Sequence, residues 1–240
     1  MTTMTTTSTT STTSTTSTTG QRAPWIEPFT AKGEHVTLVP LEPGHEAELV
    51  DAVEDGKVWD TWFAAVPSPD GMRQEIEWRL GLADEGRMVP FTVLDGQGRI
   101  AGMTSYMNVD AANRRLEIGH TWYRRSVQRT PLNTEAKLLL LQHAFEQQDC
   151  IAVSFRTAFF NQPSRRAIER LGAKLEGVWR NHVILPDGTL RDTCYYSIIA
   201  GEWPAVKRHL GWLLNRAEQA SGPTSGQAAE QTSESPSKSA

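Results

Sequence analysis

The segment from Leu116 to Gly172 constrains the fold of this chain more than any other. It runs from an apolar strand pattern (LEIGHTWY) through a basic loop and a long amphipathic helix to a second apolar strand (IAVSFRT). A strand that returns through one helix to a neighbouring strand is the parallel crossover of a mixed sheet. The loop offers backbone N–H groups at the positive end of a helix dipole. This segment therefore predicts a binding site for a cofactor that carries a diphosphate.

The patterns on either side of this crossover predict further strands and helices. Apolar and polar residues alternate in five other strand-like stretches, at 34–41, 88–95, 99–109, 173–185 and 189–199. Helical patterns cover 43–55, 70–85, 161–172 and 202–214. Turn signals such as Gly96-Gln97-Gly98 favour antiparallel hairpins. The order predicts an α+β fold with a mixed, mostly antiparallel central sheet and helices on both faces.

The two ends of the chain differ in composition from the part between them. Residues 1–22 are rich in Thr and Ser, and residues 217–240 are rich in Gly, Ser, Gln, Pro and Glu. Neither end has apolar periodicity to bury, so both are predicted to be disordered tails. The Thr/Ser tract also lacks the apolar run of a secretory signal. We expect one domain at 33–216.

Composition narrows the class of protein. Cys150 and Cys194 are too few for a disulfide framework or a zinc site, so we expect reduced thiols and no metal. No apolar run is long enough to span a membrane, which favours a cytoplasmic location. The net charge of −4 argues against a broad nucleic-acid surface. Nucleic-acid or ribosome binding stays open as an alternative through a local set of arginines: Arg114, Arg115, Arg124, Arg125 and Arg129.

The segments LEIGHTWY, QRTPLNTEAKLLLL and NQPSRRAIERLGA, in this order of elements, resemble the GNAT acetyltransferase superfamily. Within it the chain is similar to the RimJ/RimL-type branch. The resemblance covers about residues 33–205. It implies the acyl-CoA N-acyltransferase fold, acetyl-CoA as co-substrate and an amine acceptor. It also implies direct attack of the neutral amine on the thioester.

The diphosphate loop departs from the family's usual Gln/Arg-x-x-Gly-x-Gly/Ala pattern. The six positions are Gln128, Arg129, Thr130, Pro131, Leu132 and Asn133, so both glycines are absent. Thr130 can cap the helix, with Pro131 at the first helical position. The side chains of Asn133 and Thr134, with Arg129, can replace the lost backbone donor. The alternative is an ordinary capped helix behind an exposed basic loop.

The resemblance also implies how the pantetheine arm is held. It implies that the arm lies between the two strands of the crossover and pairs with the backbone of Trp122 and Tyr123. Asn161 matches the family's asparagine that contacts this arm, or else it only caps its helix. Ile168 stands where many members carry a tyrosine that protonates the leaving thiolate. Ser164 matches a serine of RimL-type enzymes, and its hydroxyl can donate that proton.

Two residues of the first crossover strand are candidates for the general base, Glu117 and His120. Because side chains of an extended strand alternate, we expect only one of them to face the acceptor. The glutamate proposed as base in RimL-type enzymes falls at Val183, beside His182. Deprotonation through water without a dedicated base is therefore an alternative. The oxyanion needs a donor, expected from a strand N–H near residues 121–123.

The acceptor pocket is expected under the first two helices and the last hairpin. Trp59, Trp62 and Phe63 are candidates for acceptor contacts and Asp60 for a cationic amine, although tryptophans at this spacing also suit a core. The sequence thus predicts an acetyl-CoA-dependent N-acetyltransferase, a monomer or homodimer, acting on a protein N-terminus or a small amine. The alternative is a catalytically silent acyl-CoA-binding or interaction module.

Overall fold

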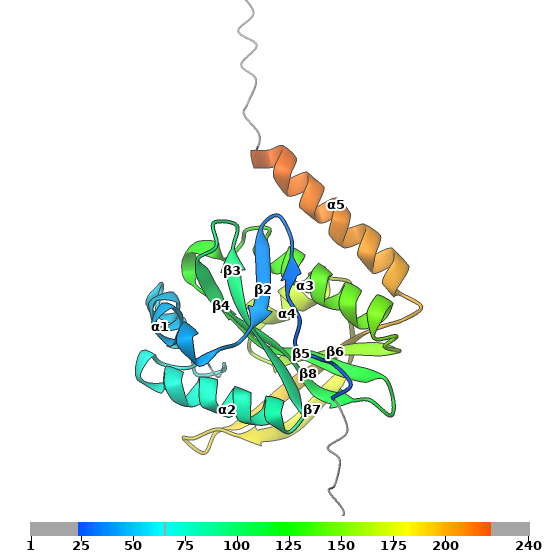
Figure 1. Cartoon of the computed structure of the whole chain (residues 1–240). Helices are drawn as coiled ribbons and strands as arrows, with labels where there is room; N and C mark the ends of the chain where they lie inside the picture. The colour runs from blue at the N-terminus through cyan, green and yellow to red at the C-terminus, as the bar shows by residue number, and fades with distance from the viewer. Residues whose placement is uncertain (1–23, 65, 222–240) are drawn as a thin grey trace, which may run out of the picture.

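The structure is a computed structural model that describes residues 24–64 and 66–221. The predicted tail at 1–22 and residues 222–240 of the predicted C-terminal tail lie outside the described residues. The described residues form one central sheet with helices on both of its faces (Figure 1).

Eight strands form the sheet in the order β1-β2-β3-β4-β5-β6-β8-β7. Their bounds are β1 Ala31–Lys32, β2 Val36–Pro40, β3 Met88–Asp95, β4 Ile100–Asp110, β5 Arg115–Tyr123, β6 Ala152–Ala158, β7 Lys174–Ile184 and β8 Leu190–Ile199. Neighbouring strands are antiparallel except β5 and β6, which are parallel. The prediction of a mixed, mostly antiparallel sheet is confirmed.

The helices are α1 Glu46–Glu54, α2 Met72–Asp84, α3 Leu132–Gln142, α4 Gln162–Arg170 and α5 Trp203–Ser221. Short 3-10 turns precede α1 and α2, and α3 continues into a π-helical turn at His143–Gln147. Prolines open both 3-10 turns, where a missing N–H has no intrahelical partner to lose. Among the described residues no helix is long and apolar enough to cross a membrane.

Two clusters of buried apolar side chains pack on opposite faces of the sheet. The larger cluster joins the sheet to α3 and α5, for example through Tyr106 and Leu140. The smaller cluster joins it to α1 and α2, for example through Met103 and Leu49. β4 contributes to both clusters because neighbouring side chains of a strand point to opposite faces. The helices of the first third of the chain therefore cover one face, and α3 and α5 cover the other (Figure 1).

Both predicted boundaries of the domain need correction. The packed chain begins before residue 33, because Ile26 is 2% exposed and the Phe29 ring lies 5.0 Å from that of Phe91. At the other end, α5 continues to Ser221, beyond the predicted helix end at 214 and domain end at 216. The stretch RAEQA at 216–220 consists of good helix formers, so the helix continues through it although its composition resembles that of the tail.

β5 and β6 separate soon after they begin. They pair only at Arg115↔Ala152, Leu116↔Val153 and Glu117↔Ser154. β6 stays paired with β8 to its end, and β5 stays paired with β4. Residues 118–123 of β5 therefore have no strand partner on the β6 side within the described sheet. This gap, with the loop to α3 at its end, positions the candidate site.

Candidate functional site

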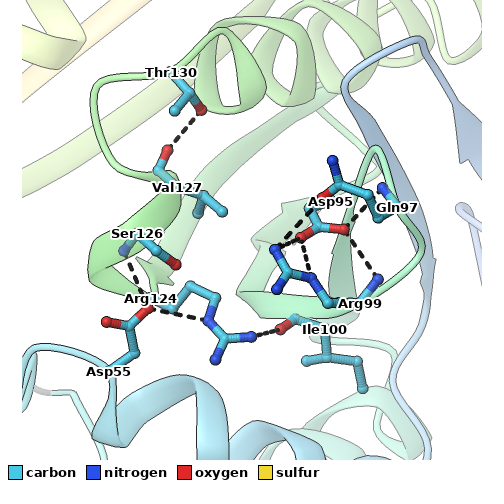
Figure 2. A network of polar contacts seen from close by, with 9 residues as sticks. All are labelled: Asp55, Asp95, Gln97, Arg99, Ile100, Arg124, Ser126, Val127 and Thr130. Atoms are coloured by element: carbon cyan, nitrogen blue, oxygen red, sulfur yellow. Dashed lines mark hydrogen bonds and ion pairs between the residues drawn. The ribbon is translucent and has the colours of Figure 1, made fainter.

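The loop between β5 and α3 is fixed to the end of α1. The carboxylate of Asp55 accepts hydrogen bonds from Nε of Arg124 (3.2 Å) and from the backbone N–H of Ser126 (3.1 Å), as Figure 2 shows. Hydrogen bonds from Ser126 and Arg124 lower the pKa of Asp55, so it stays charged at neutral pH. Gly56 has φ +83°, and a Cβ there would lie 2.4 Å from Cβ of Arg125. Only glycine permits this close approach.

The N-terminus of α3 presents free backbone donors next to the gap. The first regular helical bond joins the N–H of Glu135 to the carbonyl of Pro131 (3.0 Å). The N–H groups of Asn133 and Thr134 consequently have no acceptor within the helix. They lie at the positive end of the helix dipole, which favours an anion. The helix begins one residue later than expected, with Pro131 at the capping position.

The side chains predicted to contact the diphosphate differ in their surroundings. Gln128 donates to the carbonyl at the end of β5 (2.9 Å), and the Thr130 hydroxyl donates to the carbonyl three residues before it (2.7 Å). Arg129 is exposed and has φ 64°. The side chain of Thr134 is buried, and its hydroxyl accepts a hydrogen bond from Nη2 of Arg170 on α4 (2.8 Å). Its hydroxyl hydrogen remains a donor, so the expected contact of Thr134 with the diphosphate stays a prediction.

β5 carries a β-bulge inside the gap. Its register with β4 changes from Ser105↔Gly119 to Met103↔Trp122, so that two β5 residues, His120 and Thr121, lie opposite one residue of β4. His120 has φ 47°, in the left-handed region that is uncommon for a residue with a side chain. The surrounding structure must therefore hold this conformation in place.

Arg79 of α2 holds the bulge from one face of the sheet. Its side chain is fully buried, and its Nη2 donates to the carbonyl of His120 (3.0 Å). Nη1 donates to Oγ of Ser105 (3.1 Å), and Nε donates to the carboxylate of Glu75 (2.8 Å). These contacts fix the carbonyl of the left-handed residue, and with it the direction of the next peptide group.

Lys137 of α3 holds the bulge from the other face. Its Nζ donates to Oγ1 of Thr121 (2.8 Å) and of Thr104 (3.2 Å), and the two hydroxyl oxygens lie 2.7 Å apart. No carboxylate in the described part of the chain pairs with it. Burial lowers the pKa of Lys137 to about 7. A buried amine with such a pKa, beside an open strand, is characteristic of functional sites.

The bulge also changes which candidate bases share a face. Glu117 is 4% exposed, and its Oε2 accepts from Nε of Arg156 (2.6 Å) and Nδ2 of Asn108 (3.0 Å). The His120 ring lies 5.1 Å from Trp78 of α2. Burial and two nearby arginines, one of them Arg156, lower the pKa of His120 to about 4. Leu116 and Ile118, on either side of Glu117, belong to the larger core cluster, so Glu117 points to the other face of the sheet. The His120 ring meets Trp78 of α2 on that same face, so the expected alternation of the two candidates is wrong at this position.

A cavity of about 260 Å³ lies on the same face and is lined in part by Trp78, Arg87, Met107, Asn108 and His120. None of the four predicted acceptor residues lines it. Trp59 packs against the smaller core cluster, and Asp60 is exposed. Trp62 is 58% exposed and contacts Phe63 (5.6 Å) and Phe160 (5.7 Å), so the segment after α1 reaches the end of β6. The role of the four predicted residues in acceptor binding stays a prediction.

α4 begins where β6 ends. Oδ1 of Asn161 accepts a hydrogen bond from the backbone N–H of Ser164 (3.1 Å), so this asparagine does cap its helix. The cap uses only the oxygen of the side chain. Ser164 is half-buried in the first turn, and Ile168 is buried in the larger core cluster. A cofactor contact of Asn161 and a catalytic role of Ser164 stay predictions.

The strand that borders the gap also carries buried polar atoms without a partner. Nε1 of Trp122 and the hydroxyl of Tyr123 have no hydrogen-bond partner in the described chain, and burial raises the pKa of the Tyr123 hydroxyl. Buried polar groups in proteins are almost always paired. Residues 118–123 also have no strand partner on the β6 side, and the two features together fit a ligand that has several polar groups of its own.

Arg79, Lys137, Arg156 and Asn108 were not identified from the sequence. The first two do leave a signal, because each is a charge on the apolar face of an amphipathic helix. Lys137 stands three residues before Leu140, and Arg79 stands three residues after Ile76, and both of these neighbours are buried. Arg156 and Asn108 lie on strands, and nothing in the local pattern marks them.

Comparison with known proteins identifies the family. The family model described as acetyltransferase (GNAT) domain matches residues 35–174. YdaF of Bacillus subtilis strain 168, named as a candidate ribosomal N-acetyltransferase, is 32% identical over 186 residues, which are 75% of this chain and 100% of that protein. A solved candidate acetyltransferase from T. thermophilus is 35% identical, with a TM-score of 0.70 over 79% of this chain and 99% of that one. Mycobacterium smegmatis RimJ, solved in complex with CoA-disulfide, shares the fold at 22% identity and a TM-score of 0.63, over 74% of this chain and 88% of that one. The chain therefore belongs to the GNAT acetyltransferase family, as an acyltransferase of its RimJ/RimL-type branch.

Proposed function

We propose that this protein transfers the acetyl group of acetyl-CoA to a primary amine by direct attack in a ternary complex. The observation that carries the proposal is the gap between β5 and β6, which ends at the free N–H groups of Asn133 and Thr134. Acetyl-CoA supplies an activated acyl thioester when it is bound. The RimJ relative, solved with CoA-disulfide, supports this choice of co-substrate.

The residues along the gap suit the parts of this co-substrate. The N–H groups of Asn133 and Thr134, with the side chain of Arg129, would hold the diphosphate. Backbone groups of Trp122 and Tyr123, other than the Tyr123 carbonyl that Gln128 already uses, would pair with the amides of the pantetheine arm. The side-chain nitrogen of Asn161, which its helix cap does not use, is a further donor for this arm.

The bulge of β5 supplies the chemistry on the acyl side. Strand N–H groups at residues 121–123 would stabilise the negative charge that develops on the acyl oxygen. The Lys137 ammonium, bonded to the hydroxyl of Thr121, adds positive charge behind the same strand. The hydroxyl of Ser164 would donate a proton to the leaving thiolate.

Removal of a proton from the amine is assigned to water. A pKa of about 4 makes His120 neutral at pH 7 but a weak proton acceptor, because an efficient base has a pKa near the working pH. Glu117 is buried, and its carboxylate is already bonded to Arg156 and Asn108. Both residues would therefore orient and polarise a water molecule rather than remove the proton directly.

The acceptor is proposed to be a protein N-terminus, with a small amine as the alternative. The name of the Bacillus relative favours the first, since it refers to ribosomal N-acetylation. We further propose a cytoplasmic location and a monomer or homodimer. Both cysteines are free, which suits a reducing compartment.

Thiol release from acetyl-CoA, measured with a panel of N-terminal peptides and small amines, tests the proposal. We expect amine-dependent release for at least one peptide. Calorimetric binding of CoA with no release for any amine would leave only a silent acyl-CoA-binding module. Absence of CoA binding would contradict both functions.

The diphosphate site has its own test at Asn133. Asn133→Pro removes one backbone N–H in the first helical turn, where proline is tolerated. We expect the Kd for acetyl-CoA to rise about tenfold, as for loss of one hydrogen bond to a charged group. Asn133→Ala, which keeps the N–H, is the matched control. An unchanged Kd for the proline variant, measured by calorimetry, would place the diphosphate elsewhere.

A further inference from the structure

Basic side chains gather on the face of the sheet that bears the candidate bases. The group, termed the basic cluster, consists of Arg156 on β6, His182 on β7 and Arg191 on β8. Thr193 links two of its members: its Oγ1 lies 3.0 Å from Nδ1 of His182 and 3.5 Å from Nη2 of Arg191. The Trp179 ring packs beside the basic cluster. Its ring centre lies 5.9 Å from Cζ of Arg156 and 4.7 Å from the ring centre of His182.

The basic cluster holds more positive charge than the fold neutralises. Arg156 is paired with Glu117, but Arg191 forms no ion pair with any carboxylate among the described residues. Nε of Arg191 is buried and has no hydrogen-bond acceptor in the same part of the chain. A guanidinium keeps its proton, so deprotonation cannot remove the cost of this unpaired donor. A buried donor of a charged group without an acceptor is costly, which indicates that a ligand supplies the acceptor.

The two arginines make the basic cluster a set of donors. A guanidinium can only donate hydrogen bonds, so Arg156 and Arg191 offer N–H groups alone. Burial and the charges of these arginines lower the pKa of His182, so its ring is neutral at pH 7. The hydroxyl of Thr193 accepts from Arg191, and it either donates to Nδ1 of His182 or accepts from it. A forked set of guanidinium donors is the pattern that recognises a carboxylate.

The basic cluster adjoins the cavity beside His120. Asn108 lines that cavity and donates to Glu117, and Glu117 in turn contacts Arg156. Two direct contacts thus lead from the cavity wall to the basic cluster. An acceptor whose amine lies at the bulge of β5 has this surface beside it.

We propose that the basic cluster binds a carboxylate of the acceptor, so that the preferred acceptors are amines with a nearby carboxylate. This proposal rests on the acetyl transfer proposed above. An N-terminal peptide with an early acidic residue and a free amino acid share this chemistry. Arg191 is the specificity-determining residue, because Arg156 already has a carboxylate partner within the fold.

Paired acceptors test the preference. Hexapeptides with a free amine carry one aspartate at the second, third or fourth position, and each is compared with its asparagine counterpart. We expect kcat/KM to be about tenfold higher for aspartate at one of these positions, as for one charge-assisted hydrogen bond. Arg191→Gln should bring this ratio close to one, mainly by lowering kcat/KM for the aspartate peptide. Arg191→Lys, which keeps the charge but not the fork of donors, should retain part of the preference.

Arg180→Gln is the matched control for this experiment. Arg180 lies on the same hairpin, its side chain is 80% exposed, and it is bonded to Asp192. Its loss should leave the aspartate preference intact. Alanine against alaninamide forms a second arm, and a preference confined to this arm assigns the site to a small acceptor rather than a peptide.

Two outcomes would overturn the proposal. Equal rates for every aspartate and asparagine pair, and for alanine and its amide, would remove the carboxylate preference while leaving acetyl transfer intact. If no amine is acetylated, the carboxylate site is tested by measuring the binding of the same peptides to the CoA-loaded protein by calorimetry. Tighter aspartate binding that Arg191→Gln abolishes supports the site, and equal binding contradicts it.

Discussion

Lys137→Met is expected to make the protein more stable, although it removes hydrogen bonds. A fall of the Lys137 pKa from its ordinary 10.5 to about 7 means that the protonated form costs the fold roughly 5 kcal/mol, at about 1.4 kcal/mol per pH unit. Methionine has a similar length and needs no hydration, and the hydroxyls of Thr104 and Thr121 remain bonded to each other. After allowing for the lost bonds, we expect a gain of roughly 2–4 kcal/mol in the free energy of unfolding at pH 7.

The sign of the pH dependence makes this prediction specific. Above pH 7 the folded protein releases the Lys137 proton, whereas the unfolded chain keeps its proton up to about pH 10.5. The unfolded state then binds more protons, so the stability of the natural protein rises with pH by up to about 1.4 kcal/mol per unit. The methionine variant lacks this rise, and its advantage should shrink by about 2 kcal/mol between pH 7 and pH 9.

Urea unfolding of both proteins at pH 6, 7, 8 and 9 measures the difference, with equal m-values as a check on the comparison. Lys207→Met is the control, because Lys207 of α5 is half-exposed and paired with Glu146; this variant keeps Lys137, so its stability difference from the natural protein should stay the same from pH 6 to pH 9. A Lys137→Met variant that is less stable than the natural protein at pH 7, or whose advantage is the same at pH 9, refutes the reasoning. If the ammonium also supports the acyl oxygen, the same variant will show a lower kcat despite its greater stability.

Three other substitutions test separate parts of the structure. Ser164→Ala should lower kcat by roughly tenfold to a hundredfold without changing acetyl-CoA binding or unfolding, since its helix cap uses the backbone N–H; an unchanged kcat removes Ser164 from the mechanism. Arg79→Met should lower the free energy of unfolding by about 3 kcal/mol and also reduce kcat, because it leaves the partly buried carboxylate of Glu75 and the carbonyl of His120 unpaired; urea unfolding with the stability of the natural protein would contradict this. Gly33→Ala should destabilise by about 2 kcal/mol, because its Cβ would lie 2.3 Å from the Glu135 carboxyl carbon. In thermal unfolding Gly44→Ala, which meets open space, is the control, and equal losses would show that the carboxyl contact is not the cause.

Local patterns in the sequence were sufficient to locate seven of the eight described strands, the crossover and the loop, but not the two-residue strand β1. Alternation and turn signals depend on neighbouring residues, and the parallel pair β5 and β6 follows from one helix between two apolar strands. The bulge at His120 leaves no such trace, because it exists only as a change of register against β4. Assuming strict alternation, the sequence placed Glu117 and His120 on opposite faces, and the bulge reverses that assignment.

The charge pairing in the site depends on contacts between distant segments, so local sequence patterns could not predict it. Arg156 meets Glu117 across the strands β6 and β5. Arg191 contacts Thr193 two residues along β8, and Thr193 meets His182 across a hairpin whose own register shifts. Pattern analysis marks a strand arginine as one polar position among many. Only its partners show whether its charge is neutralised, and that is what separates Arg156 from Arg191.

Arg79 and Lys137 show why charge on an apolar helix face is informative. They reach β5 from opposite faces of the sheet and bond to adjacent residues, His120 and Thr121. A core made only of apolar side chains would be easier to stabilise, because each buried cation carries a desolvation penalty. The strand between them has open main chain along one side and a left-handed residue in its middle, so packing alone would not fix the direction of its N–H groups. The two cations supply that constraint, at the place where we propose that negative charge develops on the acyl oxygen.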